Sequence, residues 1–258
     1  MKALRRINPL ESPLYRLPTD LFPEIPSRLT SEADLVNATH TSHHLRNTLL
    51  SHPALWSHLN FDHEMRARKF FERSGQAPLH VDMVRDTAKM VGSLAELRQQ
   101  SNRIATLKLR HWSIQKRFLS EHLPSLRRLE IFYGYHDNSR EKEEWHFPSL
   151  TSLIVYELKS IPVSAPNLTR FKFLSEGRLS SKHGLLGFLG GCPLLEHIDI
   201  SYKFWPPLGE TDLIVSLPSL RTYTETNLDG TCSPTVINTL SLPPSFQSRL
   251  GSWMTTTR

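Results

Sequence analysis

The stretch LPSLRRLEI, residues 123 to 131, contains the pattern on which the predicted fold rests. Leu129 and Ile131 are apolar and flank the charged Glu130. Leu126 comes before them, separated from Leu129 by two arginines. Apolar residues at alternate positions are typical of a short strand with one buried face. The stretch therefore predicts a strand that follows a leucine packed toward the interior.

The same pattern returns four more times along the chain. Its further copies are FPSLTSLIV from Phe147, APNLTRFKF from Ala165, CPLLEHIDI from Cys192 and LPSLRTYTE from Leu217. The prolines stand at 124, 148, 166, 193 and 218, so the spacings are 24, 18, 27 and 25 residues. These spacings straddle the roughly 20–29 residue period of leucine-rich repeats. Weaker copies are RIATLKLRH from Arg103, APLHVDM from Ala77 and LSLPPSF from Leu240.

A single copy of this kind cannot bury its apolar side, whereas stacked copies share one core. We therefore predict an α/β fold with parallel strands on one side and helices or loops on the other. Residues 61–258 form an irregular solenoid of leucine-rich-repeat type in this prediction. The charged insertion over 134–146 is expected to be an exposed loop.

The residues between the buried strand positions are expected to share one exposed face of the sheet. They are Arg128, Glu130, Ser152, Ile154, Arg170, Lys172, His197, Asp199, Thr222 and Thr224. Solenoids bind partners on such a surface. The charged members, and therefore the candidates for contact with a substrate, are Arg128, Glu130, Arg170, Lys172, His197 and Asp199. A surface that is only solvated is the alternative, and the sequence leaves both open.

Ahead of the repeats lies the segment LPTDLFPEIPSRLTSEADL, residues 17 to 35. Apolar residues recur every four positions, as on one side of a helix, but Pro23 and Pro26 stand among them, and an interior proline breaks a helix. We expect a short, irregular first helix whose apolar side serves as a docking surface. A second helix is predicted from the N-cap Ser31 to Pro53, with one stripe through Leu35, Ala38, Ser42, Leu45 and Leu49.

Residues 16–60 resemble an F-box, most closely those of mushroom-type fungi. The resemblance rests on the order Leu17-Pro18, Leu21, Ile25, Leu29, Asp34-Leu35, the run TSHHLRNTLLSHPALW and Trp56. It implies a three-helix unit that docks on the Skp-type adaptor of a cullin–RING ubiquitin ligase. It also implies an adaptor-binding set of Leu17, Pro18, Leu21, Ile25 and Leu29, and a core of Leu35, Leu45 and Trp56.

The chain departs from the F-box pattern at two positions. Pro26 replaces a helix-compatible residue, which bears on adaptor affinity, and Ser42 replaces a common cysteine. Residues 1–15 are then an N-terminal extension to the F-box-like domain.

Composition narrows the possible functions. Lysine and arginine outnumber the acids by 31 to 25 in 258 residues, a mild excess without the dense basic block of a nucleic-acid arm. Two cysteines, with neither a signal peptide nor a membrane span, indicate an intracellular protein of the cytoplasm or nucleus.

His40, His43 and His44 have a metal-like spacing but no fourth ligand nearby. Phosphate-loop and nucleophile-elbow motifs are absent, so we predict no catalysis, cofactor or metal.

Three hypotheses follow from the sequence. The first is a substrate-recognition adaptor of a Skp–cullin–F-box ubiquitin ligase, which binds the Skp-type adaptor and a protein substrate. The second is a leucine-rich-repeat interaction scaffold that does not bind a ligase. The third is a nucleic-acid-binding protein, which only the mild basic charge supports.

Overall fold

A computed structural model of the chain describes residues 32–41, 43–83, 91–110, 119, 122–132, 145–156, 163–178, 182–204, 214–227 and 240–243. The predicted adaptor-binding residues 17–29 lie outside this range. The chain divides into two compact units, Met1–Leu59 with Met65–Leu79, and Asn60–Glu64 with His80–Arg258. The first unit thus extends past residue 60, where the sequence suggested a boundary.

The described part of the first unit is helical. It contains α2 (Glu32–Thr41), α3 (His43–Leu50), the 3-10 helix η4 (Pro53–Trp56) and most of α4 (Glu64–Arg73), which is followed by Gly75 with a φ of 51°. The Trp56 indole N–H donates to the Leu49 carbonyl at 2.9 Å, and its ring packs edge-on against Phe70 at 5.0 Å. Trp56 is fully buried and therefore forms the centre of this core.

The prediction of one continuous helix from Ser31 to Pro53 is wrong, because α2 and α3 are separate helices. The Thr39 hydroxyl donates to the Val36 carbonyl at 2.6 Å, and the Thr41 hydroxyl to the Ala38 carbonyl at 2.8 Å. Threonine side chains that bond back to the preceding turn bend or weaken a helix, and threonine has low helix propensity. The buried residues of α2 are Leu35 and Thr39, whereas Ala38 is half-buried.

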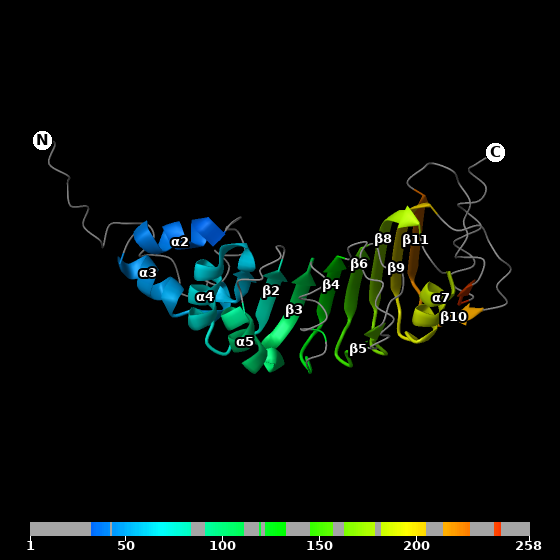
Figure 1. Cartoon of the computed structure of the whole chain (residues 1–258), viewed down its shortest axis with the longest axis horizontal. Coiled ribbons are helices and arrows are strands. Elements are labelled where there is room, and N and C mark those ends of the chain that lie inside the picture. The colour runs from blue at the N-terminus through cyan, green and yellow to red at the C-terminus, as the bar shows by residue number, and fades with distance from the viewer. Residues whose placement is uncertain are drawn as a thin grey trace, which may run out of the picture. The chain divides into compact units, whose positions relative to one another are not determined.

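A large, mostly parallel sheet, nearly all of whose residues belong to the second unit, confirms the α/β class (Figure 1). Its eight strands are neighbours in chain order: β1 (His58–Asn60), β2 (Leu79–Met83), β3 (Ile104–Leu109), β4 (Arg128–Phe132), β6 (Ser152–Tyr156), β8 (Arg170–Arg178), β9 (His197–Phe204) and β11 (Thr222–Asn227). All pairs from β3 to β11 are parallel. Helical segments of this unit are η5 (Phe61–His63), α5 (Val91–Gln99), η6 (Ser101–Arg103) and α7 (Lys182–Gly190). No described helix has the length and apolar content that crossing a bilayer requires.

The five proline-containing copies share one local structure. In each, the leucine two positions after the proline donates its amide to the carbonyl of the residue before the proline, at 3.1 to 3.3 Å. Proline suits the second position of such a four-residue turn because its ring fixes φ. Each of these leucines is at most 3% exposed: Leu126, Leu150, Leu168, Leu195 and Leu220. The sequence repeat is therefore a turn that delivers one leucine to the core and starts one strand.

The strands bury two rows of side chains in register. The first row is Leu107, Leu129, Leu153, Phe171 and Ile198, and the second is Leu109, Ile131, Val155, Phe173 and Ile200. Each of these residues is at most 2% exposed. Alternation along a strand then directs the intervening side chains to the opposite face.

Two short strand pairs extend the repeat upstream of the prolines. β5 (Trp145–His146) pairs with β7 (Val163–Ser164), and β10 (Val215–Ser216) pairs with β12 (Leu240–Ser241). Each of these four strands begins three residues before a proline. The exposed-loop prediction for 134–146 is therefore wrong at its end, where Trp145 is 4% exposed, because this residue already belongs to the next copy. Residues 133–144 lie outside the described range.

Candidate binding face of the sheet

The polar face of the sheet consists of three rows of residues that alternate with the buried rows. The first row is Thr106, Arg128, Ser152, Arg170, His197 and Thr222, and the second is Lys108, Glu130, Ile154, Lys172, Asp199 and Thr224. The third is Phe132, Tyr156, Leu174, Ser201 and Thr226. All ten residues that the sequence places on one face lie in the first two rows.

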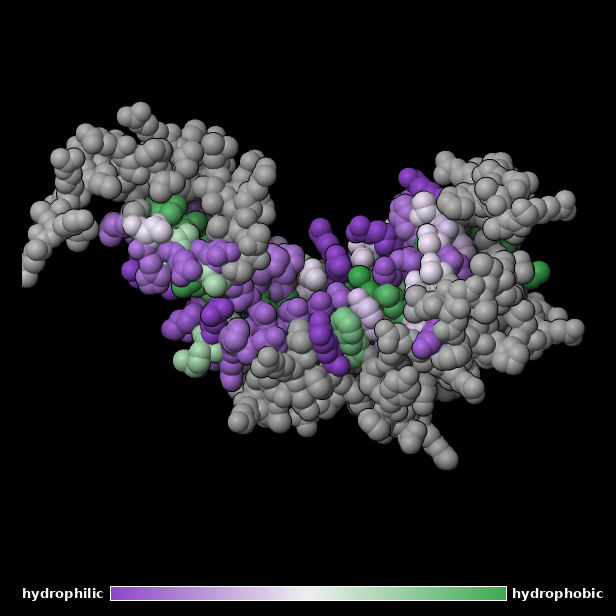
Figure 2. Space-filling view, turned by 90° about the horizontal axis from the view of Figure 1, so that it is seen from above, coloured by the Kyte–Doolittle hydropathy of each residue, from purple (hydrophilic) through white to green (hydrophobic). Residues whose placement is uncertain are grey.

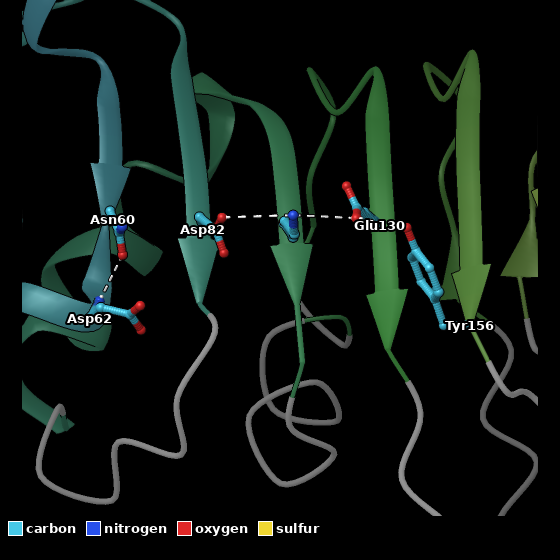
Figure 3. A network of polar contacts seen from close by, with 6 residues as sticks. Asn60, Asp62, Asp82, Glu130 and Tyr156 are labelled. Carbon is cyan, nitrogen blue, oxygen red and sulfur yellow. Dashed lines mark hydrogen bonds and ion pairs between the residues drawn. The ribbon is translucent and has the colours of Figure 1, made fainter. Parts of the chain in front are cut away.

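Charges in the second row pair with one another. Lys108 Nζ lies 3.4 Å from Glu130 Oε1 and 4.0 Å from Asp82 Oδ2 on the neighbouring β2, and Lys172 Nζ lies 2.6 Å from Asp199 Oδ2. Figure 3 shows Asp82 and Glu130 on either side of β3, which carries Lys108. This row is therefore neutralised within the protein.

The Glu130 side chain is held within the protein more tightly than a side chain that is free to contact a substrate. It is only 9% exposed, and the Tyr156 hydroxyl donates to its Oε1 at 3.3 Å (Figure 3). Burial, together with the nearby Glu130 carboxylate, raises the pKa of Tyr156. Tyr156 therefore stays protonated and continues to donate this hydrogen bond.

The surroundings of Asp82 disfavour the charged form of its carboxyl group. Burial raises the pKa of its carboxyl group, and Asp62 and Glu130 add to this effect, whereas Lys108 and Arg110 oppose it. Asp62 is held at the start of η5 because its amide donates to Asn60 Oδ1 at 2.9 Å (Figure 3). Within the described residues, no three His, Cys, Asp or Glu side chains are arranged to hold a metal ion.

The first row differs because its arginines form no ion pair with any described residue. His197 Nδ1 lies 2.7 Å from Thr222 Oγ1, and His197 Nε2 lies 3.7 Å from Glu196. Arg128 and Arg170 are exposed, and neither forms an ion pair with another described residue. Two of the six charged candidates therefore remain available to an external anion.

The third row contributes an aromatic surface. The rings of Phe132 and Tyr156 stack at 3.8 Å with an interplanar angle of 7°, and the Arg110 guanidinium lies 4.7 Å from the Phe132 centroid. Phe132, Tyr156 and Leu174 are half-buried, so part of each side chain meets solvent. In Figure 2, hydrophobic groups in green lie among hydrophilic groups in purple over the middle strands.

Several residues of the polar face were not anticipated from the sequence. They are Asp82, Lys108, Arg110, Phe132 and Tyr156. Aligning the proline-free copies with the others would have placed Lys108 beside Glu130. Extending each copy by one residue would have brought in Phe132 and Tyr156.

The remaining sequence predictions concern the first unit, and the two cysteines are considered with them. Leu35, Leu45 and Trp56 are all buried, at 5%, 8% and 0% exposure. Leu17, Pro18, Leu21, Ile25 and Leu29 lie outside the described residues, as does Cys232. Cys192 is 1% exposed, and burial raises the pKa of its thiol to about 12, so it is a core residue and not a nucleophile.

Comparison of the chain with protein-family models, with curated proteins and with solved structures finds no match.

Proposed function

We propose that this chain is a substrate-recognition adaptor of a Skp–cullin–F-box type ubiquitin ligase that works in the cytoplasm or nucleus. Its N-terminal segment, through Leu17, Pro18, Leu21, Ile25 and Leu29, docks on the Skp-type adaptor. The polar face of the sheet binds a protein substrate. The chain supplies no transfer chemistry and acts by raising the effective concentration of the substrate near the ligase.

The observation that carries the substrate-binding half of this proposal is the regular register of the polar face. Five turn-and-strand copies present their outward residues side by side on neighbouring parallel strands. We take these copies to be a degenerate leucine-rich-repeat solenoid, whose sheet face is a usual partner surface. Arg128 and Arg170 on this face have no ion-pair partner among the described residues, and the rings of Phe132 and Tyr156 on the same face are half-buried.

The ligase-binding half is supported by the F-box resemblance together with the burial of residues that follow the proposed docking segment. Leu35, Leu45 and Trp56 are buried within the described chain, as the core of such a unit requires. In this proposal the apolar residues of 17–29 are left for the second protein. Apolar helical segments commonly bind in this way, by laying their side chains into a groove.

A pull-down of the full chain with the Skp-type adaptor tests the proposal. Wild type is expected to bind, and Leu21→Asp and Ile25→Asp are expected to lose binding. Ile214→Asp is the matched control, because Ile214 is apolar and 73% exposed but belongs to the second unit. If wild type does not bind, or if both variants bind as well as wild type, the ligase function is wrong.

The second candidate function is an interaction scaffold without a ligase. The sequence favours it through Pro23 and Pro26, because prolines inside a helix are expected to disrupt it. The scaffold predicts no adaptor binding by wild type but normal binding of a protein partner to the polar face. The same pull-down therefore separates the two functions.

A further inference from the structure

Arg128, Ser152 and Arg170, here called the Arg–Ser–Arg triplet, are neighbours across three parallel strands. Arg128 on β4 pairs in register with Ser152 on β6, which pairs with Arg170 on β8. At a strand spacing of about 4.8 Å, the two arginine Cα atoms lie about 10 Å apart. Strand alternation directs all three side chains to the polar face, because the next residue on each strand is buried.

The charge of this triplet is not compensated by the described residues. Neither guanidinium has an ion pair there, and the Ser152 hydroxyl makes no hydrogen bond to another described residue. Ser152 is nevertheless only 9% exposed. The carboxylates of the adjacent row, Glu130 and Asp199, are already paired with lysines. A polar, nearly buried hydroxyl thus lies between two cations that no described residue neutralises.

The number and type of donors identify the ligand class. Each guanidinium can bind an oxyanion through two parallel N–H groups, and the hydroxyl adds a further donor. A phosphate monoester offers three acceptor oxygens and a charge of about −1.5 to −2, whereas a carboxylate offers two oxygens and one charge. We propose that the Arg–Ser–Arg triplet binds a phosphorylated side chain of a protein partner, which rests on the proposed role of the polar face in substrate binding.

The surroundings of the triplet favour a peptide over a nucleic acid. Lys108 and Lys172 on the same face are already paired with Glu130 and Asp199, so a continuous phosphodiester backbone would have to break these ion pairs to find further cations. A peptide carries a single phosphate and meets alternating charges without this penalty. The ligand is therefore a phosphopeptide segment.

The stacked Phe132 and Tyr156 supply a second anchor for the same peptide. They lie four residues beyond Arg128 and Ser152 on the same two strands. Four extended residues span about 13 Å, so a peptide that runs along the strands reaches both anchors. The segment accordingly carries a phosphorylated residue and an apolar residue about four positions apart.

Fluorescence polarisation with the full chain and degenerate peptide pools tests this inference. The pools fix phosphoserine, serine or glutamate at one position and leucine or serine four positions to either side. The phosphoserine–leucine pools are expected to bind wild type and to be displaced by inorganic phosphate. Arg128→Gln and Arg170→Gln are each expected to weaken binding by about tenfold or more, the usual loss for a charged hydrogen bond.

Arg127→Gln is the matched control, because Arg127 is an exposed arginine next in sequence to Arg128 and outside the triplet. It is expected to change the affinity less than twofold. All three sites are exposed, and thermal melting verifies that the variants fold. Arg128→Lys and Arg170→Lys, which keep the charge but lose the bidentate geometry, are expected to retain only part of the affinity.

Four results would overturn the inference. Two of them are that the serine pools, or the glutamate pools, bind as tightly as the phosphoserine pools. The third is that Arg127→Gln lowers the affinity as much as Arg128→Gln and Arg170→Gln do. The fourth is that a single-stranded DNA oligonucleotide binds more tightly than the peptides and that the same two variants abolish its binding. The assay contains no Skp-type adaptor, so a failure of ligase docking leaves its result unchanged. Conversely, the adaptor pull-down does not depend on Arg128 or Arg170.

Discussion

Replacing Lys108 by methionine tests whether burial gives the charge pairs of the sheet their strength. Lys108 bridges Glu130 at 3.4 Å and Asp82 at 4.0 Å, and the Lys108 and Glu130 side chains are 27% and 11% exposed. At an effective dielectric constant of about 20, the Lys108–Glu130 attraction is about 5 kcal/mol before desolvation is subtracted. Desolvation offsets most of this, so we expect a net coupling of about 1–2 kcal/mol. Methionine keeps the length of the apolar stem and removes only the charge.

The Lys172–Asp199 pair provides a control in the same row of the same sheet. Its N–O distance is shorter, at 2.6 Å, but its side chains are 43% and 37% exposed. Exposed pairs contribute about 0.2–1 kcal/mol, so the shorter pair is expected to be the weaker one.

Double-mutant cycles measured by urea unfolding compare the two pairs. The variants are Lys108→Met with Glu130→Gln, and Lys172→Met with Asp199→Asn. Lys108→Met alone is expected to cost about 2–3 kcal/mol, because Glu130 and Asp82 then lose the lysine between them. A Lys108–Glu130 coupling equal to or below that of Lys172–Asp199 would refute the argument that burial, and not distance, sets the strength.

Three further predictions concern the core and titration. Leu126→Ala is expected to lower the free energy of unfolding, measured in urea, by about 2–5 kcal/mol, because Leu126 is fully buried. Leu194→Ala is the control and is expected to lower it by less than about 0.5 kcal/mol, because Leu194 is 47% exposed. Burial raises the pKa of Asp82, so its charge costs stability above its ordinary pKa of about 4. Asp82→Asn is thus expected to stabilise the fold at pH 7 and to lose this gain below about pH 4; destabilisation at pH 7 would contradict it. Cys192 is expected to resist iodoacetamide until urea unfolds the chain, as peptide mass spectrometry can show, because burial raises its thiol pKa to about 12.

Local sequence patterns were enough to predict the strands of the sheet from β2 onward, together with their inward residues. Each copy carries its own turn, in which proline fixes the backbone and the following leucine reaches the core, so nine residues suffice to place one strand. Because such units lie beside their sequence neighbours, the parallel order of the strands followed as well. The positions of Arg128, Arg170, Lys172 and Asp199 on one face are a consequence of alternation alone.

Which of those outward residues are left without an ion-pair partner among the described residues depends on how the strands come together in three dimensions. Lys108 and Glu130 are 22 residues apart in sequence, and their pairing depends on the register between two strands. The same register leaves Arg128 and Arg170 on either side of Ser152 without a carboxylate in their row. The split between α2 and α3 also escaped the periodic pattern, because threonine hydroxyls compete for backbone carbonyls. Local sequence fixes what each segment becomes, whereas charge pairing and exposure depend on which segments become neighbours.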